Sequence, residues 1–192
     1  MASPDTAGRP LTDFEQVLLG VIAEEPRSGY GLKKLFNSTP ASVYQPSPGA
    51  LYPALRRLEH RGLLRVEESV SSGRRRRRLY HVTAAGDAAH LGWLREPVAP
   101  ASIAPELGLH LMRFTMMENR LPRTEVLTFL KCLADALDGF VTGMEEYAAA
   151  EAESESPGRH GLLALDHGIA VHRASLEWAR AAMAALAEPG ET

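Results

Sequence analysis

Five consecutive arginines, Arg74 to Arg78, form the densest group of charged residues in the chain. Guanidinium groups bind phosphate through paired hydrogen bonds, so this run is suited to binding a polyanion such as a nucleic acid. A disordered basic tail and a localisation signal are the alternative interpretations. The flanking residues favour a folded hairpin, because the Ser71–Gly73 segment has turn chemistry and the LYHVT segment after the run is typical of a strand.

A second basic group, Arg56 and Arg57, lies in the segment PSPGALYPALRRLEHRG, which predicts a helix from Ser47 to Arg61. Ser47 can cap this helix, and Gly62 can end it. Its buried stripe is formed by Leu51, Leu55 and Leu58, and its opposite face carries Gly49, Pro53, Arg56 and His60, flanked by Tyr52 and Arg57. A solvated charged face is the alternative interpretation of the two arginines.

Two helices precede this basic helix and must position it. The first begins at a T-x-x-E capping box, Thr12 with Glu15, carries a single apolar stripe and ends at Pro26. The second covers about residues 28–37. We expect it to leave Lys33 and Lys34 outside and to bury four apolar side chains: Tyr30, Leu32, Leu35 and Phe36.

The arginine run itself belongs to the second arm of a hairpin that follows the basic helix. The segment LLRVEESV predicts the first strand, and strand alternation places Tyr80 and Val82 on the core side, with Arg75 and Arg77 on the other face. Three helices followed by such a hairpin predict a winged helix-turn-helix over residues 11–95.

The second half of the chain, residues 96–187, predicts an α-helical domain, so the whole chain is expected to be mostly α with a small β-hairpin. A fourth helix runs from Thr83 to about Arg95, and Leu107, Leu111 and Phe114 indicate a fifth. Two long helices follow, at 122–151 and from about 162. Both carry apolar heptad seams, which predicts that they pack against each other like a coiled coil. The seam of the first long helix runs from Val126 to Tyr147.

The last helix carries a second, mostly alanine stripe around Trp178, formed by Ala170, Ala174, Ala181 and Ala185. A helical hairpin does not need two apolar faces, so this domain is predicted to form a homodimer. Packing on an earlier helix of the same chain is the alternative. The residues assigned to dimerisation are Leu162, Leu165, Ile169, His172, Leu176, Trp178 and Met183.

The charge distribution separates the two halves. Residues 1–95 carry 14 Lys and Arg against 9 Asp and Glu, a net charge of +5, whereas residues 96–192 carry 7 against 15, a net charge of −8. This asymmetry indicates that the first half meets a polyanion. With one cysteine, Cys132, no secretory signal and no long apolar segment, the chain is expected to act in the cytoplasm, away from membranes. We find no catalytic motif, no metal-ligand spacing among the histidines and no cofactor loop, so we do not expect an enzyme, a metal site or a cofactor.

Three stretches of the first half resemble the PadR family of bacterial transcriptional regulators. They are LLGVIAEEPRSGYGLKK, QPSPGALYPALRRLEHRGLL and SGRRRRRLYHVTAAG. The ALDHGIAVHRASLEWARAAMAAL stretch resembles the end of the longer family members, so the resemblance covers about residues 11–187. The unbroken arginines depart from the family, whose wing usually alternates Arg with Pro or Lys and ends in two aromatics.

The resemblance implies a homodimeric regulator of transcription, most simply a repressor, that binds an inverted repeat in double-stranded DNA. The residues assigned to DNA binding are Tyr30, Lys33, Lys34, Ser47, Gly49, Tyr52, Pro53, Arg56, Arg57, Arg74, Arg75, Arg76, Arg77 and Arg78. By position, Trp93 is the candidate to bind a small aromatic or amphipathic effector, with a core role as the alternative. A protein–protein assembly module and a ligand-independent activator are the alternative functions.

Overall fold

The computed structural model describes residues 9–38, 48–70, 76–154 and 158–187; the side chains of residues 48, 69, 70, 76 and 77 lie outside the described part. The chain divides into two compact units, an N-terminal unit of residues 1–94 and a C-terminal unit of residues 95–192. Within the described ranges, no helix combines the length and the hydropathy needed to cross a membrane.

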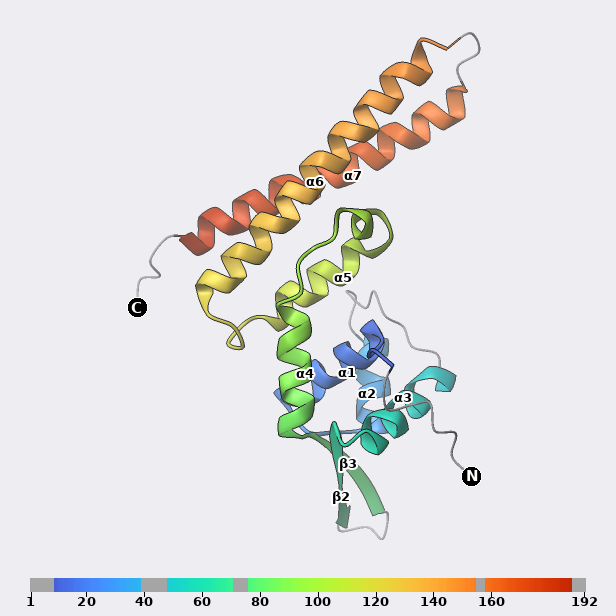
Figure 1. Ribbon diagram of the computed structural model, residues 1–192. Helices are drawn as coiled ribbons and strands as arrows, with labels where there is room; N and C mark the ends of the chain where they lie inside the picture. The colour runs from blue at the N-terminus through green and yellow to red at the C-terminus, as the bar shows by residue number, and fades with distance from the viewer. Residues whose placement is uncertain (1–8, 39–47, 71–75, 155–157, 188–192) are drawn as a thin grey trace. The chain divides into compact units, whose positions relative to one another are not determined.

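The N-terminal unit contains four helices and a small antiparallel sheet in its described part (Figure 1). Its elements are α1 (Asp13–Glu24), β1 (Arg27–Ser28), α2 (Gly29–Ser38), α3 (Pro48–His60), β2 (Leu64–Val70), β3 (Arg76–Val82) and α4 (Ala84–Leu94). Three helices followed by a hairpin form a winged helix-turn-helix, in which α3 is the recognition helix and the β2–β3 hairpin is the wing. The predicted fold class is confirmed.

The capping box at the start of α1 is confirmed. The Glu15 backbone N–H donates to Thr12 Oγ1 at 3.3 Å, and the Thr12 backbone N–H donates to Glu15 Oε2 at 2.9 Å. The helix that begins there buries its apolar stripe in a core shared with α3, whose Leu51, Leu55 and Leu58 are buried as predicted. Because both helices bury one face, α3 presents its opposite face outward.

The wing has a fixed register. Val66 pairs with Tyr80 and Val70 with Arg76, and Tyr80 is buried, as the alternation predicts. Arg78 lies two residues before Tyr80 and therefore projects from the same face of the strand. A third strand, β1, was not predicted; it pairs Arg27 with Tyr80 and Ser28 with Leu79, which gives the sheet order β1-β3-β2.

The base of the wing is joined tightly to α4. The Thr83 backbone N–H donates to the Leu63 carbonyl at 3.0 Å, and the Thr83 hydroxyl donates to the Gly62 carbonyl at 2.7 Å. The Gly86 N–H donates back to Thr83 Oγ1 at 3.1 Å. A Cβ atom at Gly86 would lie 2.1 Å from the Leu63 carbonyl oxygen, so only glycine allows this approach. The junction therefore sets where α4 begins relative to the wing.

The C-terminal unit is helical throughout its described part. It contains η1 (Pro100–Ser102), α5 (Ile103–Met116), α6 (Arg123–Ala152) and α7 (Arg159–Ala187). The long helices α6 and α7 pack along each other, which confirms their predicted pairing. The prediction that Tyr147 lies in the seam is wrong, because its side chain is 63% exposed. A helix with 3.6 residues per turn drifts from a heptad seam, and Tyr147 is the last position of that seam.

Candidate nucleic-acid interface

The outward face of α3 carries the residues that the sequence assigned to it. Gly49, Tyr52, Pro53 and Arg56 are all exposed, and Pro53 lies inside the helix. Ser47 lies outside the described residues. The exposed face thus combines small or flat residues, which allow a close approach, with a guanidinium group that can donate to phosphate or to base edges.

Tyr52 is held by a glycine of α2. A Cβ atom added to Gly29 would lie 2.8 Å from Cε1 of the Tyr52 ring. The ring therefore occupies the space that any larger residue at position 29 would need, and it remains 44% exposed. This contact orients the Tyr52 side chain at the junction of the two helices.

Tyr30 does not lie in the core of α2, and the prediction that it is buried is wrong: its side chain is 75% exposed. The buried stripe of α2 is formed by Gly29, Leu32 and Phe36, at steps of three and four residues. At 100° per residue, Tyr30 falls on the opposite side of the helix from that stripe. Tyr30 is therefore accessible together with Lys33 and Lys34, which are exposed as predicted.

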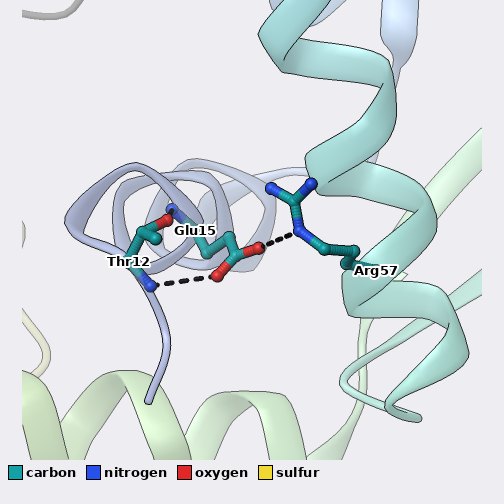
Figure 2. A network of polar contacts seen from close by, with 3 residues as sticks. All are labelled: Thr12, Glu15 and Arg57. Atoms are coloured by element: carbon teal, nitrogen blue, oxygen red, sulfur yellow. Dashed lines mark hydrogen bonds and ion pairs between the residues drawn. The ribbon is translucent and has the colours of Figure 1, made fainter. Parts of the chain in front are cut away.

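Arg57 is bound to a carboxylate of the same unit (Figure 2). Its Nε donates to Glu15 Oε1 at 2.7 Å, which joins α3 to the first turn of α1 across 42 residues of sequence. The Arg57 side chain is 39% exposed and that of Glu15 is 2% exposed. Arg57 is therefore partly a structural residue and not simply a member of a solvated face.

Glu15 is held in its ionised form. Burial raises its pKa, but the hydrogen bond from the Thr12 backbone and the hydrogen bond and charge of Arg57 lower the pKa by more. Its place in the first turn of α1 also favours a negative charge, because the backbone N–H groups there carry partial positive charge. The pair is thus a charged hydrogen bond in which Glu15 is the buried partner.

Arg78, the last of the five arginines, is also bound within the unit. Its Nη2 donates to both carboxylate oxygens of Glu59, at 2.9 and 3.1 Å, and its guanidinium lies 5.9 Å from the centre of the Tyr80 ring. This ion pair joins the wing to the last turn of α3. Arg74 and Arg75 lie outside the described residues; Arg76 and Arg77 belong to β3, but their side chains lie outside the described part.

Residues 18–90 match the family model described as the Transcriptional regulator PadR-like family. By its N-terminal unit, the chain belongs to the PadR-like family. It is 56% identical over 46 residues to the Transcriptional regulator Rv3488 of Mycobacterium tuberculosis (strain ATCC 25618 / H37Rv), across 24% of this chain and 42% of that relative. The chain thus matches less than half the length of this curated relative.

Several solved structures are also similar. Bacillus subtilis PadR in complex with operator DNA is 16% identical with a TM-score of 0.44, over 91% of this chain and 99% of that one. The same protein in complex with p-coumaric acid is 16% identical with a TM-score of 0.41, over 98% and 100%. The PadR-like regulator BC1756 from Bacillus cereus is 20% identical with a TM-score of 0.43, over 93% and 98%. These identities and scores are low, so the family assignment rests on the family model.

In this PadR-like chain Trp93 lies in the buried part of α4. Its ring centroid is 5.7 Å from that of His90, one turn earlier, and both side chains are buried within the N-terminal unit. This environment fits the core role that the sequence left open. Its role in effector binding stays a prediction.

The residues assigned to dimerisation fall on two sides of α7. Ile169 and Leu176 are buried, and Leu162, Leu165 and Met183 are partly exposed. The His172 ring lies 4.7 Å from that of Phe140 on α6, so the seam is used within the chain. Trp178 is 37% exposed and meets Phe114 of α5 edge-on at 5.3 Å, which is part of the intrachain packing that was the alternative. Their role in dimerisation stays a prediction.

Glu15 and Glu59 are the functional candidates that sequence reasoning missed. Both were assigned ordinary roles, Glu15 as half of a capping box and Glu59 as a surface residue of α3. Their partners lie 42 and 19 residues away, and no local pattern predicts such pairs. The one available signal was the position of Glu15 at the start of α1, opposite a helix with two adjacent arginines.

Proposed function

We propose that this PadR-like protein is a sequence-specific regulator of transcription that binds double-stranded DNA as a homodimeric repressor. The observation that carries the proposal is the outward face of α3, where Tyr52 packs over Gly29 and Arg56 lies exposed one turn further on. An exposed helix face of this composition fits a major groove. The basic charge of the first half supports a polyanionic partner.

In the proposed complex α3 enters the major groove, with Tyr52 and Arg56 meeting bases or the phosphates at the groove edge. Tyr30, Lys33 and Lys34 of α2 are exposed and suited to phosphate contacts that fix the orientation of the domain. The arginines of the wing extend the contact along the backbone, and one of them enters the minor groove.

The proposed dimer uses α7. Opposite its seam with α6 this helix carries exposed apolar residues, including Leu163, Val171 and Trp178. Exposed apolar residues in a stripe favour association with a second copy of the chain. A two-fold dimer of this kind would bind an inverted repeat whose half-sites are about 34–36 Å apart.

We further propose that a small aromatic effector releases the DNA and that Trp93 contributes to its site. The adjacent His90 and Trp93 rings offer an aromatic surface in α4. Titrating p-coumaric acid into a Trp178→Phe variant, in which Trp93 is the remaining tryptophan, tests this. Quenching of Trp93 fluorescence is expected, and no change would refute a site for this compound beside Trp93.

The DNA proposal is tested with duplexes selected from a random pool by the protein itself and assayed by electrophoretic mobility shift. Replacing Arg56 by Ala is expected to weaken binding by about 10-fold or more, the effect of losing one specific contact. Arg173→Ala, which removes an exposed arginine of α7, is the matched control and is expected to bind like the wild type. If no sequence is enriched and no shift occurs at low salt, the proposal is wrong.

A further inference from the structure

The guanidinium of Arg57 is held by one of its three nitrogens. Nε donates to Glu15 Oε1 at 2.7 Å, and Figure 2 shows the two terminal Nη nitrogens on the side away from the carboxylate. The side chain is 39% exposed. Arg78 differs, because its Nη2 is used by both oxygens of Glu59. Arg57 is therefore oriented by Nε while its two Nη groups remain on the solvent side.

The carboxylate that holds Arg57 is itself immobilised. Glu15 Oε2 accepts the Thr12 backbone N–H at 2.9 Å, so each carboxylate oxygen has its own donor. The side chain is almost fully buried, and the reciprocal capping bond from the Glu15 N–H to Thr12 fixes the start of the helix. A rigid acceptor of this kind fixes the plane of the planar guanidinium, which a flexible surface carboxylate does not.

Arg57 lies at the edge of the recognition face, not at its centre. At 100° per residue it is 100° around α3 from Arg56, towards the first turn of α1. When a helix lies in a major groove, residues at the edge of its exposed face lie beside the sugar–phosphate backbone, and residues at its centre lie beside the bases. Two Nη groups in one plane match two oxygens of one phosphate.

We propose that Glu15 is a positioning residue for DNA binding. It holds Arg57 by Nε so that the two Nη groups of Arg57 bind a single backbone phosphate beside α3. This inference rests on the proposed DNA-binding function and adds to it a defined phosphate contact and the residue that orients it. Glu15 itself does not touch DNA, because its side chain is buried against α3.

The benefit of this arrangement is that Arg57 is ordered before DNA arrives. Ordering a long side chain on binding weakens association by about 2- to 10-fold. Glu15→Gln leaves one acceptor oxygen for two donors, the Thr12 N–H and Arg57 Nε, so one of them loses its partner. The variant is therefore expected to bind DNA about 2- to 10-fold more weakly while Arg57 still reaches the phosphate.

The test is a double-mutant cycle on the full-length protein, with duplex DNA selected by the wild type as the probe. The dissociation constant is measured against salt concentration for the wild type, Glu15→Gln, Arg57→Ala and the double variant. Arg57→Ala is expected to reduce the slope of log K against log salt by about 0.9, because one phosphate contact is lost. Glu15→Gln is expected to keep the slope, and in the Arg57→Ala background it is expected to have no further effect.

Two further variants keep the test decisive. Asp13→Asn removes a negative charge from the same turn of α1 and is expected to bind like the wild type, which separates positioning from charge. Arg57→Lys keeps the charge but has no Nε, so it is expected to retain the salt slope and to lose affinity as Glu15→Gln does. Because it leaves Glu15 intact, it tests the inference even if Glu15→Gln unfolds.

The outcomes that overturn the inference differ from those that overturn the proposed function. If the wild type binds DNA and Arg57→Ala keeps the full salt slope, Arg57 does not contact phosphate and the inference is wrong, although the function stands. If Glu15→Gln weakens binding equally in the presence and absence of Arg57, Glu15 acts by another route and the inference is also wrong. If the wild type binds no DNA, both are wrong.

Discussion

Replacing Gly86 by Ala separates the steric demand at the base of the wing from ordinary helix preference. Gly86 and Gly92 both lie in α4, and alanine at either position gains about 1 kcal/mol of intrinsic helix preference. A Cβ atom at Gly86 would lie 2.1 Å from the Leu63 carbonyl oxygen, whereas a Cβ atom at Gly92 has nothing within 4 Å. The difference between the two variants is therefore the steric cost at Gly86 alone.

That cost follows from what cannot move. The Leu63 carbonyl accepts the Thr83 N–H at 3.0 Å, and Thr83 also bonds Gly62, so α4 cannot move away without breaking these bonds. Overpacking of this kind costs about 1–3 kcal/mol. At about 4–8 °C per kcal/mol for a domain of this size, Gly86→Ala should melt clearly below Gly92→Ala. Gly92→Ala should melt at or slightly above the wild type.

The assay is thermal unfolding of the full chain in a Trp178→Phe background, followed by fluorescence. Trp93 is then the remaining tryptophan and lies buried in α4, so its signal reports the N-terminal unit. Equal midpoints for Gly86→Ala and Gly92→Ala would refute the reasoning. They would mean that the contact between α4 and the Leu63 carbonyl relaxes at no cost.

Three other predictions concern separate parts of the chain. Burial, with a smaller contribution from the charge of Arg113, lowers the pKa of His110 to about 4. The stability that neutral His110 contributes is full above pH 6.5 and is lost as the pH falls towards 4, by up to about 3 kcal/mol, so the free energy of unfolding should fall over this window in the wild type and less in His110→Gln. Replacing Arg75, Arg76 and Arg77 by Ala should flatten the salt dependence of DNA binding by about 0.9 per lost contact and preserve sequence preference; collapse of the preference with an unchanged slope would show that these arginines read bases. Val171→Lys, on the exposed side of α7, should shift the protein from dimer to monomer in sedimentation velocity, whereas Arg180→Ala should not; a dimeric Val171→Lys would exclude this face as the interface.

The elements of the N-terminal unit were predictable because their signals are local. The Thr12–Glu15 box, Pro26 and Gly62 mark helix ends through contacts within a few residues, and the structure has the helix boundaries within about two residues of those expected. Strand β1 was not predictable, because two residues carry no periodicity. They form a strand only through pairing with Tyr80 and Leu79, far along the chain.

The candidate interface was predictable in its helix and wing but not in the roles of individual arginines. Exposure of Arg56 follows from its position opposite Leu51, Leu55 and Leu58. The partners of Arg57 and Arg78 do not follow from any sequence pattern, since each depends on how helices and wing pack. Tyr30 failed for a related reason: an aromatic side chain was assigned to the core by type, and the phase of α2 decided otherwise.

The carboxylates of the N-terminal unit sort its basic residues into two groups. Arg57 and Arg78 each lie against a glutamate, so at a distance each pair is nearly neutral and adds little to the attraction of DNA. Long-range attraction therefore comes from residues such as Lys33, Lys34 and Arg56. The paired arginines contribute in a different way, because a guanidinium held in one orientation adds geometric selectivity to a phosphate contact. The salt slope should consequently be smaller than the number of basic residues on this face suggests, and removing a glutamate should change affinity more than it changes the slope.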